Sequence, residues 1–180
     1  DQMLRALPRP FDFGCCNGRF FLNNMGIGFE GAVAERLKGL AKRPGKAGYL
    51  WAVLRTIFRY RSSAYTLRYN DLELSGRFLI LHISNGRRAG GGFHISPLAA
   101  ADDGWLDLVS CKSLPVWKRL RYLPVMERGR HIPLPFIRHD RVRQLVIESG
   151  QPVSFHLDGE WATASRFVVD IRIGGLQIRV

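Results

Sequence analysis

The sequence predicts a mainly β (α+β) domain, an antiparallel β-sandwich or flattened barrel with two or three appended helices. Many short segments alternate as strands do, whereas only a few show helical spacing. These strands and helices do not follow the repeated βαβ order that a parallel sheet requires. With 180 residues and 46% hydrophobic content, the chain can form one domain, or one large lobe of a two-lobe enzyme, with a substantial core. We therefore expect a single β-rich unit over residues 1–180.

The first 60 residues are predicted to contain one short strand and two helices. Residues 18–24 form the strand, and the glycines of 25–29 are expected to bend the backbone. Residues 30–40 have apolar side chains on one helical face, and 38–46 form a basic loop. The second helix, 47–60, is amphipathic because Leu50, Val53, Leu54, Ile57 and Phe58 lie opposite Arg55, Arg59 and Arg61.

The chain after residue 60 is predicted to be rich in strands. One helix is expected at 115–123, since a proline at its start loses little from its missing N–H. Prolines and a glycine interrupt 124–135, which we expect to be a loop. Apolar or alternating segments predict strands at 64–69, 71–75, 77–85, 105–110, 144–149, 152–157, 167–173 and 176–180.

The charge of the chain favours an anionic partner. Twenty-seven basic residues against 15 acidic ones give a net charge of +12, which suits nucleic acid, a phosphorylated ligand or an anionic membrane surface. The basic helix 47–60 could contact lipid headgroups through Arg55, Arg59 and Arg61, with Lys38, Lys42, Arg43 and Lys46 beside it, or could be a solvated face. Around the second basic cluster, 118–143, the aromatic residues have no stacking arrangement, so nucleic acid is not expected.

Compartment and metal signals are few. Three cysteines at irregular spacing fit neither a disulfide framework nor a zinc site and favour a reducing cytoplasm. No segment approaches the roughly 20 apolar residues that a membrane span needs, and Asp1 begins no signal-peptide pattern, so any membrane contact should be peripheral. The histidines have no metal-binding spacing, and His82 and His156 are expected to pack or hydrogen-bond within strands.

Four segments, in order, resemble one enzyme family. They are Phe21-Leu22-Asn23-Asn24-Met25-Gly26-Ile27-Gly28-Phe29; Ser84-Asn85-Gly86 with Gly90-Gly91-Gly92-Phe93; the stretch from Pro97 to Asp107; and Leu157-Asp158-Gly159-Glu160. On these motifs, the chain resembles the carboxyl-terminal lobe of the diacylglycerol kinase and sphingosine kinase superfamily, particularly the bacterial soluble lipid kinases. The resemblance extends over nearly the whole chain.

The resemblance implies a partner lobe and two cofactors. In such enzymes, an amino-terminal α/β lobe carries a Gly-Gly-Asp-Gly-Thr loop that holds ATP, and magnesium is required. That loop is absent from this sequence, and the run Gly90-Gly91-Gly92 lacks the lysine and hydroxyl residue of a P-loop. We therefore expect ATP to be bound mainly by an amino-terminal lobe absent from this chain, and this lobe alone to be inactive.

The resemblance also implies two sets of site residues. Glu160, with Asp158 as its neighbour or as the alternative base, would take the proton from the attacking hydroxyl. Without the family, Asp158-Gly159 equally fits an ordinary turn between strands. The Asp103 side chain, with the carbonyls of Ala100 and Trp105, would hold a structural magnesium, or Asp103-Gly104 is another turn.

These features predict the substrate-side lobe of an ATP-dependent lipid kinase, which transfers a γ-phosphate to a hydroxyl of a diacylglycerol-like or sphingoid lipid. We expect a cytoplasmic protein that associates peripherally with an anionic membrane surface. One alternative is a non-catalytic lipid- or membrane-binding regulatory module, which fits the positive charge equally well. Another is a lobe of a nicotinamide-nucleotide kinase, but the Leu157-Asp158-Gly159-Glu160 segment favours the lipid kinases.

Overall fold

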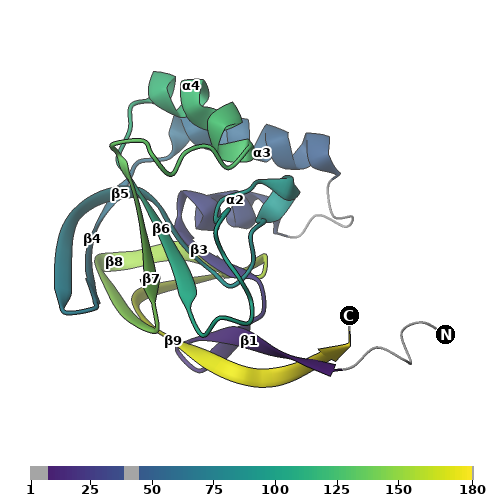
Figure 1. Ribbon diagram of the computed structural model, residues 1–180. Helices are drawn as coiled ribbons and strands as arrows, with labels where there is room; N and C mark the ends of the chain where they lie inside the picture. The colour runs from purple at the N-terminus through teal and green to yellow at the C-terminus, as the bar shows by residue number, and fades with distance from the viewer. Residues whose placement is uncertain (1–7, 39–44, 180) are drawn as a thin grey trace.

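The fold is an antiparallel sheet that curls on itself and carries a layer of helices (Figure 1). The computed structural model describes residues 8–38 and 45–179. Within them the strands are β1 (Pro8–Cys16), β2 (Arg19–Phe21), β3 (Asn24–Gly28), β4 (Ser63–Tyr69), β5 (Leu72–Ser84), β6 (Leu106–Lys112), β7 (Ile137–Val142), β8 (Gln144–Leu157) and β9 (Glu160–Arg179). The helices are α2 (Phe29–Leu37), α3 (Lys46–Arg59) and α4 (Val116–Glu127), with a short 3-10 turn, η1 (Gly90–Gly92).

Four strands close into a ring at the centre of the sheet. Strand β3 pairs with β5 on one side and β8 on the other, and β4 pairs with the same two strands. The remaining strands extend from this ring in the order β9-β1-β2 beyond β8 and β6-β7 beyond β5. Every pairing is antiparallel, so the expected flattened barrel with appended helices is confirmed.

The sheet separates two apolar cores. Inside the ring, strand residues at alternate positions, such as Met25, Ile27, Leu81 and Ile83, are fully buried. Outside it, a second core fills the space between the sheet and the helices, and it includes Phe29, Val33, Ala52, Val53, Ile57, Leu79, Phe93, Cys111 and Met126. Residues 25–28 form a buried strand, and the expected glycine bend is found only at its end, where Gly28 with φ 83° turns the chain into α2.

The three predicted helices are all present. Helix α2 begins at Phe29, and α3 buries Ala52, Val53, Thr56 and Ile57 against the sheet. Helix α4 continues past Pro124 to Glu127, where a loop was expected. Pro124 removes one backbone N–H from the helix, but the last turn of α4 still buries Met126 against the second core. Residues 39–44 of the predicted basic loop, including Lys42 and Arg43, lie outside the described residues, and Lys46 starts α3. Among the described helices, none has the length and apolar character to cross a membrane.

Several predicted strands merge into long ones. Residues 71–75 and 77–85 form most of one strand, β5, which passes through Gly76. Strand β8 joins 144–149 and 152–157, with a shift in its register to β9 between Glu148 and Val153. Strand β9 runs from Glu160 to Arg179 and, with β1, forms the two-stranded arm at the bottom of Figure 1. Long, bent strands of this kind are what a closed ring needs.

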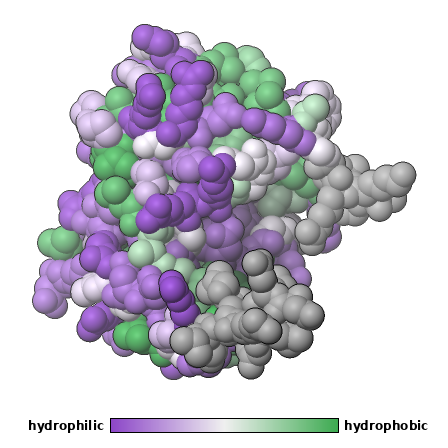
Figure 2. Space-filling model, turned by 45° about the vertical axis from the view of Figure 1, so that its right-hand side comes forward, coloured by the Kyte–Doolittle hydropathy of each residue, from purple (hydrophilic) through white to green (hydrophobic). Residues whose placement is uncertain are grey.

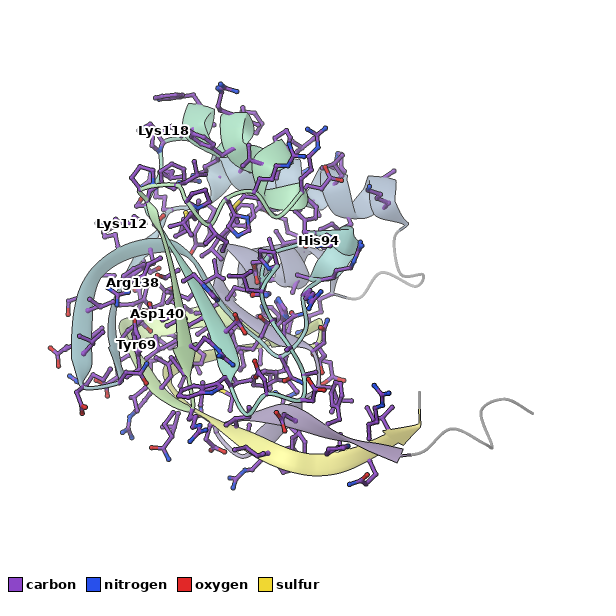
Figure 3. The ribbon with its side chains drawn as sticks, in the orientation of Figure 1. Tyr69, His94, Lys112, Lys118, Arg138 and Asp140 are labelled. Carbon is purple, nitrogen blue, oxygen red and sulfur yellow. The ribbon has the colours of Figure 1, made fainter. Side chains whose placement is uncertain are left out.

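Two strands had no clear signal in the sequence. Strand β1 contains Pro8 and Pro10, yet it pairs with β9 over its length, with a register shift between Phe11 and Phe13. Strand β7, with the sequence IRHDRV, lies at the sheet edge and pairs with β6. The Tyr69 hydroxyl donates to Asp140 Oδ2 at 2.8 Å, and Arg138 bonds the same carboxylate (Figure 3). These contacts attach a highly charged strand to β4.

Candidate functional site: an apolar pocket beside an acidic turn

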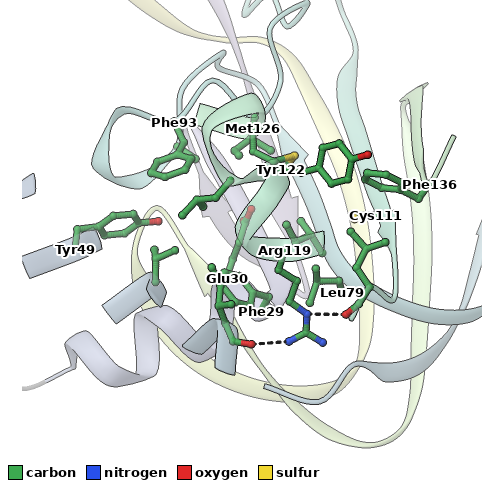
Figure 4. A pocket seen from close by; sticks show the side chains of 17 residues that line it. Phe29, Glu30, Tyr49, Leu79, Phe93, Cys111, Arg119, Tyr122, Met126 and Phe136 are labelled. Carbon is green, nitrogen blue, oxygen red and sulfur yellow. Dashed lines mark hydrogen bonds between the residues drawn. The ribbon is translucent and has the colours of Figure 1, made fainter. Parts of the chain in front are cut away.

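An apolar pocket lies between the helices and the sheet (Figure 4). Its roof comes from α3 and α4, and its floor comes from β5, β6 and the start of α2. The lining residues are Phe29, Glu30, Tyr49, Val53, Ile57, Leu79, Ile80, Ala89, Phe93, Ile95, Cys111, Leu114, Arg119, Tyr122, Leu123, Met126 and Phe136. Apart from Glu30 and Arg119, these side chains are aliphatic, aromatic or sulfur-containing, which suits a hydrocarbon chain.

Arg119 joins the two roof helices instead of pointing a charge into the pocket. Its guanidinium donates to the carbonyls of Ile57 and Tyr60 at 3.0 and 2.8 Å, and to Leu114 O at 2.8 Å. The dashed lines of Figure 4 show two of these bonds. Burial lowers the Arg119 pKa, with Tyr60 and Cys111 acting in the opposite direction. Because the guanidinium caps the free carbonyls at the end of α3, it holds α4 against α3.

A polar pocket adjoins the apolar pocket. Its lining residues are Asn23, Asn24, Glu30, Val33, Ala34, Tyr49, Ala89, Gly90, His156, Asp158 and Gly159. Three of them, Glu30, Tyr49 and Ala89, also line the apolar pocket. We call these three residues the junction, because they stand where the apolar and polar walls meet.

Glu30 is held at the junction by two histidines. Gly26 on β3 pairs with His82 on β5 and with His156 on β8, so both imidazoles flank it. His82 Nδ1 lies 2.8 Å from Glu30 Oε2, and His156 Nε2 lies 3.6 Å from the same oxygen. A Cβ atom at position 26 would lie 2.0 Å from that oxygen, so the glycine provides the space for the carboxylate.

The histidines keep this buried carboxylate ionised. The Glu30 side chain is 11% exposed, and its burial acts to raise its pKa. The charge of His82 and the hydrogen bonds from both imidazoles more than offset burial and lower the pKa. Burial raises the pKa of the neighbouring Tyr49 hydroxyl, and the Glu30 charge adds to that shift, so the phenol remains a neutral donor.

Asp158 occupies a two-residue turn and is bonded to the backbone. Asp158 and Gly159 join β8 to β9, with φ angles of 47° and 90°. The Asp158 carboxylate accepts the N–H groups of Leu22, Asn23 and Asn24 at 2.6, 3.0 and 2.8 Å. The side chain therefore fixes the turn between β2 and β3, and the turn geometry considered for Asp158-Gly159 is present.

Glu160 lies just beyond this turn, at the surface. Its side chain is 79% exposed, and Arg19 Nη2 lies 3.2 Å from its Oε2. Asp158 and Gly159 line the polar pocket, whereas Glu160 is not among the lining residues. The two predicted catalytic carboxylates thus share one hairpin but face different surroundings.

The predicted metal residues lie in the loop that leads from η1 into β6. Asp103 Oδ1 accepts the N–H of Trp105 at 3.0 Å, and Oδ2 pairs with Arg141. Buried Asp12 holds the same loop by accepting Gly104 N–H at 2.8 Å and donating its own N–H to Ala101 O. The proposed donors, one carboxylate and the carbonyls of Ala100 and Trp105, are oxygen ligands that suit magnesium. However, Arg141 already provides a positive charge to Asp103.

Sequence reasoning missed the junction. His82 and His156 were expected to pack or hydrogen-bond within strands, and they are buried there, but their partner Glu30 was treated only as the start of a helix. A carboxylate directly after Met25-Gly26-Ile27-Gly28-Phe29, in the first turn of a helix, was the available signal. Gly90 and Gly91 were noted only as part of a sequence motif. In the structure, they make room for the Tyr49 ring, because a Cβ atom at position 90 or 91 would lie 2.9 or 2.4 Å from it.

The fold is a β-sandwich-like lobe with an apolar pocket next to a polar one. The family model described as the YegS C-terminal NAD kinase beta sandwich-like domain matches residues 23–180, and the chain belongs to this family. The expected relation to the bacterial lipid kinases is therefore confirmed.

Related proteins and structures agree with this assignment. A "Probable lipid kinase YegS-like" protein of Pseudomonas savastanoi pv. phaseolicola is 35% identical over 99% of this chain and 58% of its own length. A protein of the same description from Pseudomonas aeruginosa is 32% identical over 99% of this chain and 59% of its own length. Two solved structures from Bacillus anthracis str. Sterne, described as "a putative diacylglycerol kinase" and as a diacylglycerol kinase, superpose with TM-scores of 0.74 and 0.64. Their identities are 22% and 17%, over 96% of this chain and 56% and 54% of theirs, so they bear on the fold alone. The chain thus spans somewhat more than half the length of its relatives.

Proposed function

We propose that this chain is the substrate-side lobe of an ATP-dependent lipid kinase, which phosphorylates a hydroxyl of a diacylglycerol-like or sphingoid lipid. The observation that carries the proposal is that the apolar and polar pockets are adjacent and share three wall residues, Glu30, Tyr49 and Ala89. An amphipathic alcohol can place its hydrocarbon chain under α3 and α4 and its polar end beside the Asp158-Gly159 turn. A nucleotide has no hydrocarbon part to fill the apolar pocket, so the arrangement favours a lipid over a nicotinamide nucleotide.

In this proposal, each part of the acidic turn has one task. Phosphoryl transfer requires alignment of the hydroxyl with the γ-phosphate and a group that takes the hydroxyl proton. Glu160 is the proposed base, since its carboxylate is exposed where ATP bound by a second lobe could approach. Asp158 anchors the turn, because three N–H groups already occupy its carboxylate oxygens. Arg19, paired with Glu160, would have to release it or share it during the reaction.

Magnesium remains part of the proposal as a structural ion. Asp103, with the carbonyls of Ala100 and Trp105, would hold the ion. The role of the magnesium would be to fix the loop between η1 and β6. Because Arg141 already pairs with Asp103, a magnesium ion would have to displace that guanidinium. ATP is proposed to bind to an amino-terminal lobe of the longer protein.

The helical roof is the proposed membrane-facing surface. Trp51 and Phe58 on α3 and Trp117 on α4 are 59%, 62% and 63% exposed, so the outer side of these helices is not a purely polar solvated face. Arg55 lies over the Trp51 ring, and Lys118 lies near the Trp117 ring. Figure 2 shows apolar and strongly hydrophilic residues side by side on this upper part of the molecule. Exposed aromatic rings among basic side chains suit an anionic bilayer surface, and such contact would place the apolar pocket next to its substrate.

Lipid phosphorylation by the intact kinase tests the proposal. The assay follows transfer of labelled γ-phosphate to dioctanoylglycerol, to sphingosine and to a nicotinamide nucleotide. Glu160→Gln should lower kcat roughly 100-fold or more if Glu160 is the base. Glu73→Gln is a matched control, since Glu73 is also an exposed strand glutamate next to a two-residue turn and paired with an arginine, Arg68.

Each result has a distinct meaning. Transfer to a nicotinamide nucleotide in preference to lipid would reject the lipid substrate. Lipid binding without any phosphate transfer by the intact protein would favour a regulatory module. Equal activity of the Glu160 and Glu73 variants would remove Glu160 as the base while leaving the kinase activity itself established.

A further inference from the structure

Glu30 and Tyr49 are the two polar side chains of the junction between the apolar and polar pockets. Both side chains belong to the wall of both pockets. In Figure 4, Tyr49 lies at the left of the apolar pocket and Phe136 at the right, with Glu30 between them. Any amphipathic ligand that occupies both pockets must place the boundary between its hydrocarbon and polar parts next to this pair.

The Glu30 carboxylate has an acceptor available for such a ligand. Its Oε2 faces the two imidazoles, at 2.8 Å from His82 and 3.6 Å from His156. Its Oε1 makes no hydrogen bond with any residue in the described ranges 8–38 and 45–179. An ionised carboxylate can only accept hydrogen bonds, so this oxygen selects a donor and repels an anion.

The same carboxylate is connected to the acidic turn. His156, which approaches Glu30 through Nε2, accepts the Gly159 N–H at its Nδ1 at 3.3 Å. Glu30 is therefore one side chain away from the turn that carries Asp158 and Glu160. A group bound to Glu30 would lie in the polar pocket that this turn also lines.

We infer that Glu30, with the Tyr49 hydroxyl across the junction, binds the hydroxyl group of the lipid alcohol and so orients it toward the acidic turn. The inference rests on the proposed function and adds a recognition element to it. Glu30 is a substrate-binding residue in this role, not the base. The lipid phosphate formed by the reaction would be repelled from the same place, which helps the product leave.

A substrate and an inhibitor that differ by one donor test this inference. The intact kinase is assayed with dioctanoylglycerol as substrate, and with its 3-O-methyl ether, which has no hydroxyl to donate, as competitive inhibitor. Glu30→Gln should raise the KM for dioctanoylglycerol about tenfold, since a hydrogen bond to a charged group is lost. The KM for ATP and the inhibition constant of the ether should change less than about twofold, because neither depends on that bond.

Two further variants make the test independent of folding. Glu35→Gln, on the exposed side of the same helix, removes an equal charge and should leave all constants unchanged. Tyr49→Phe keeps the ring that packs on Gly90 and Gly91 and should raise the KM for the alcohol about threefold, again without affecting the ether. If Glu30→Gln does not fold, the Tyr49→Phe result decides.

The outcomes separate this inference from the proposed function. Alcohol and ether constants that rise together in Glu30→Gln would indicate loss of pocket structure and overturn the hydroxyl assignment. An unchanged alcohol KM in an active kinase would overturn it as well. A wild-type kinase that phosphorylates no lipid alcohol would reject the proposed function, and the inference with it.

Discussion

Replacing Asp158 with glycine should destabilise the domain by about 3 kcal/mol, although the turn itself tolerates glycine at a positive φ. The residue stands at φ 47°, where glycine is favourable, so the substitution removes the carboxylate without straining the backbone. What is lost is the acceptor for the N–H groups of Leu22, Asn23 and Asn24. The change therefore measures how much the acidic turn contributes to stability.

The magnitude follows from the surroundings of each N–H group. Asn24 is 3% exposed, so its N–H loses a charged partner without gaining water, which costs about 2 kcal/mol. Leu22 and Asn23 are exposed, and their N–H groups can bond water, so each costs about 0.5 kcal/mol. For a domain of this size, a loss of about 3 kcal/mol lowers Tm by roughly 6 to 12 °C.

Chemical denaturation and thermal melting of the wild type and two variants would measure this effect. Asp71→Gly is the matched control, because Asp71 also lies in a two-residue turn at positive φ. The Asp71 carboxylate makes no hydrogen bond in the part of the chain that the structure describes. Equal losses of stability in Asp158→Gly and Asp71→Gly would refute the assignment of Asp158 as an anchor for the β2–β3 turn.

Three other predictions concern pH, magnesium and membranes. Folding lowers the Glu30 pKa from 4.5 to about 2, so the ionised carboxylate stabilises the folded protein above pH 4.5, and this stabilisation is lost as the pH falls toward 2. In acid titrations, the excess free energy of unfolding of the wild type over Glu30→Gln should therefore shrink between pH 4.5 and 2. Arg141→Gln should enlarge the rise in Tm produced by magnesium chloride over EDTA, and Asp103→Asn should abolish it; a magnesium response independent of both side chains would place the ion elsewhere. Replacing Trp51 and Trp117 together with alanine should weaken binding to phosphatidylserine vesicles about tenfold, and unchanged sedimentation with the vesicles would count against the helical roof as the membrane surface.

Local patterns were sufficient for the helices and for most of the sheet. Apolar spacing identified α3 because its buried positions recur at helical intervals, and alternation identified β4. The pattern was too weak for β7, where charged residues dominate and contacts such as Tyr69 with Asp140 compensate. It was only partly right at 25–28, since Gly26 serves close packing within a strand and Gly28 alone, with a positive φ, makes the bend into α2.

The candidate site was only half visible in the sequence. The Asp158-Gly159-Glu160 segment is continuous, so its motif and its turn could both be recognised. In the Glu30 cluster, His82 lies 52 residues and His156 lies 126 residues after Glu30 along the chain. Only the pairing of β5 and β8 with β3 brings them together, and no local pattern encodes that register.

The closed ring has a consequence for how substrate preference can change. His82 and His156 lie on β5 and β8, which pair with the two sides of β3, and Glu30 lies in the first turn of α2, directly after β3. Most of the roof, by contrast, consists of side chains on α3 beyond Tyr49 and on α4, which no ladder constrains. Under the proposed function, exchanges at Val53, Ile57 or Met126 would alter the accepted chain length while the hydroxyl contact is retained, so the two halves of lipid selectivity would diversify separately.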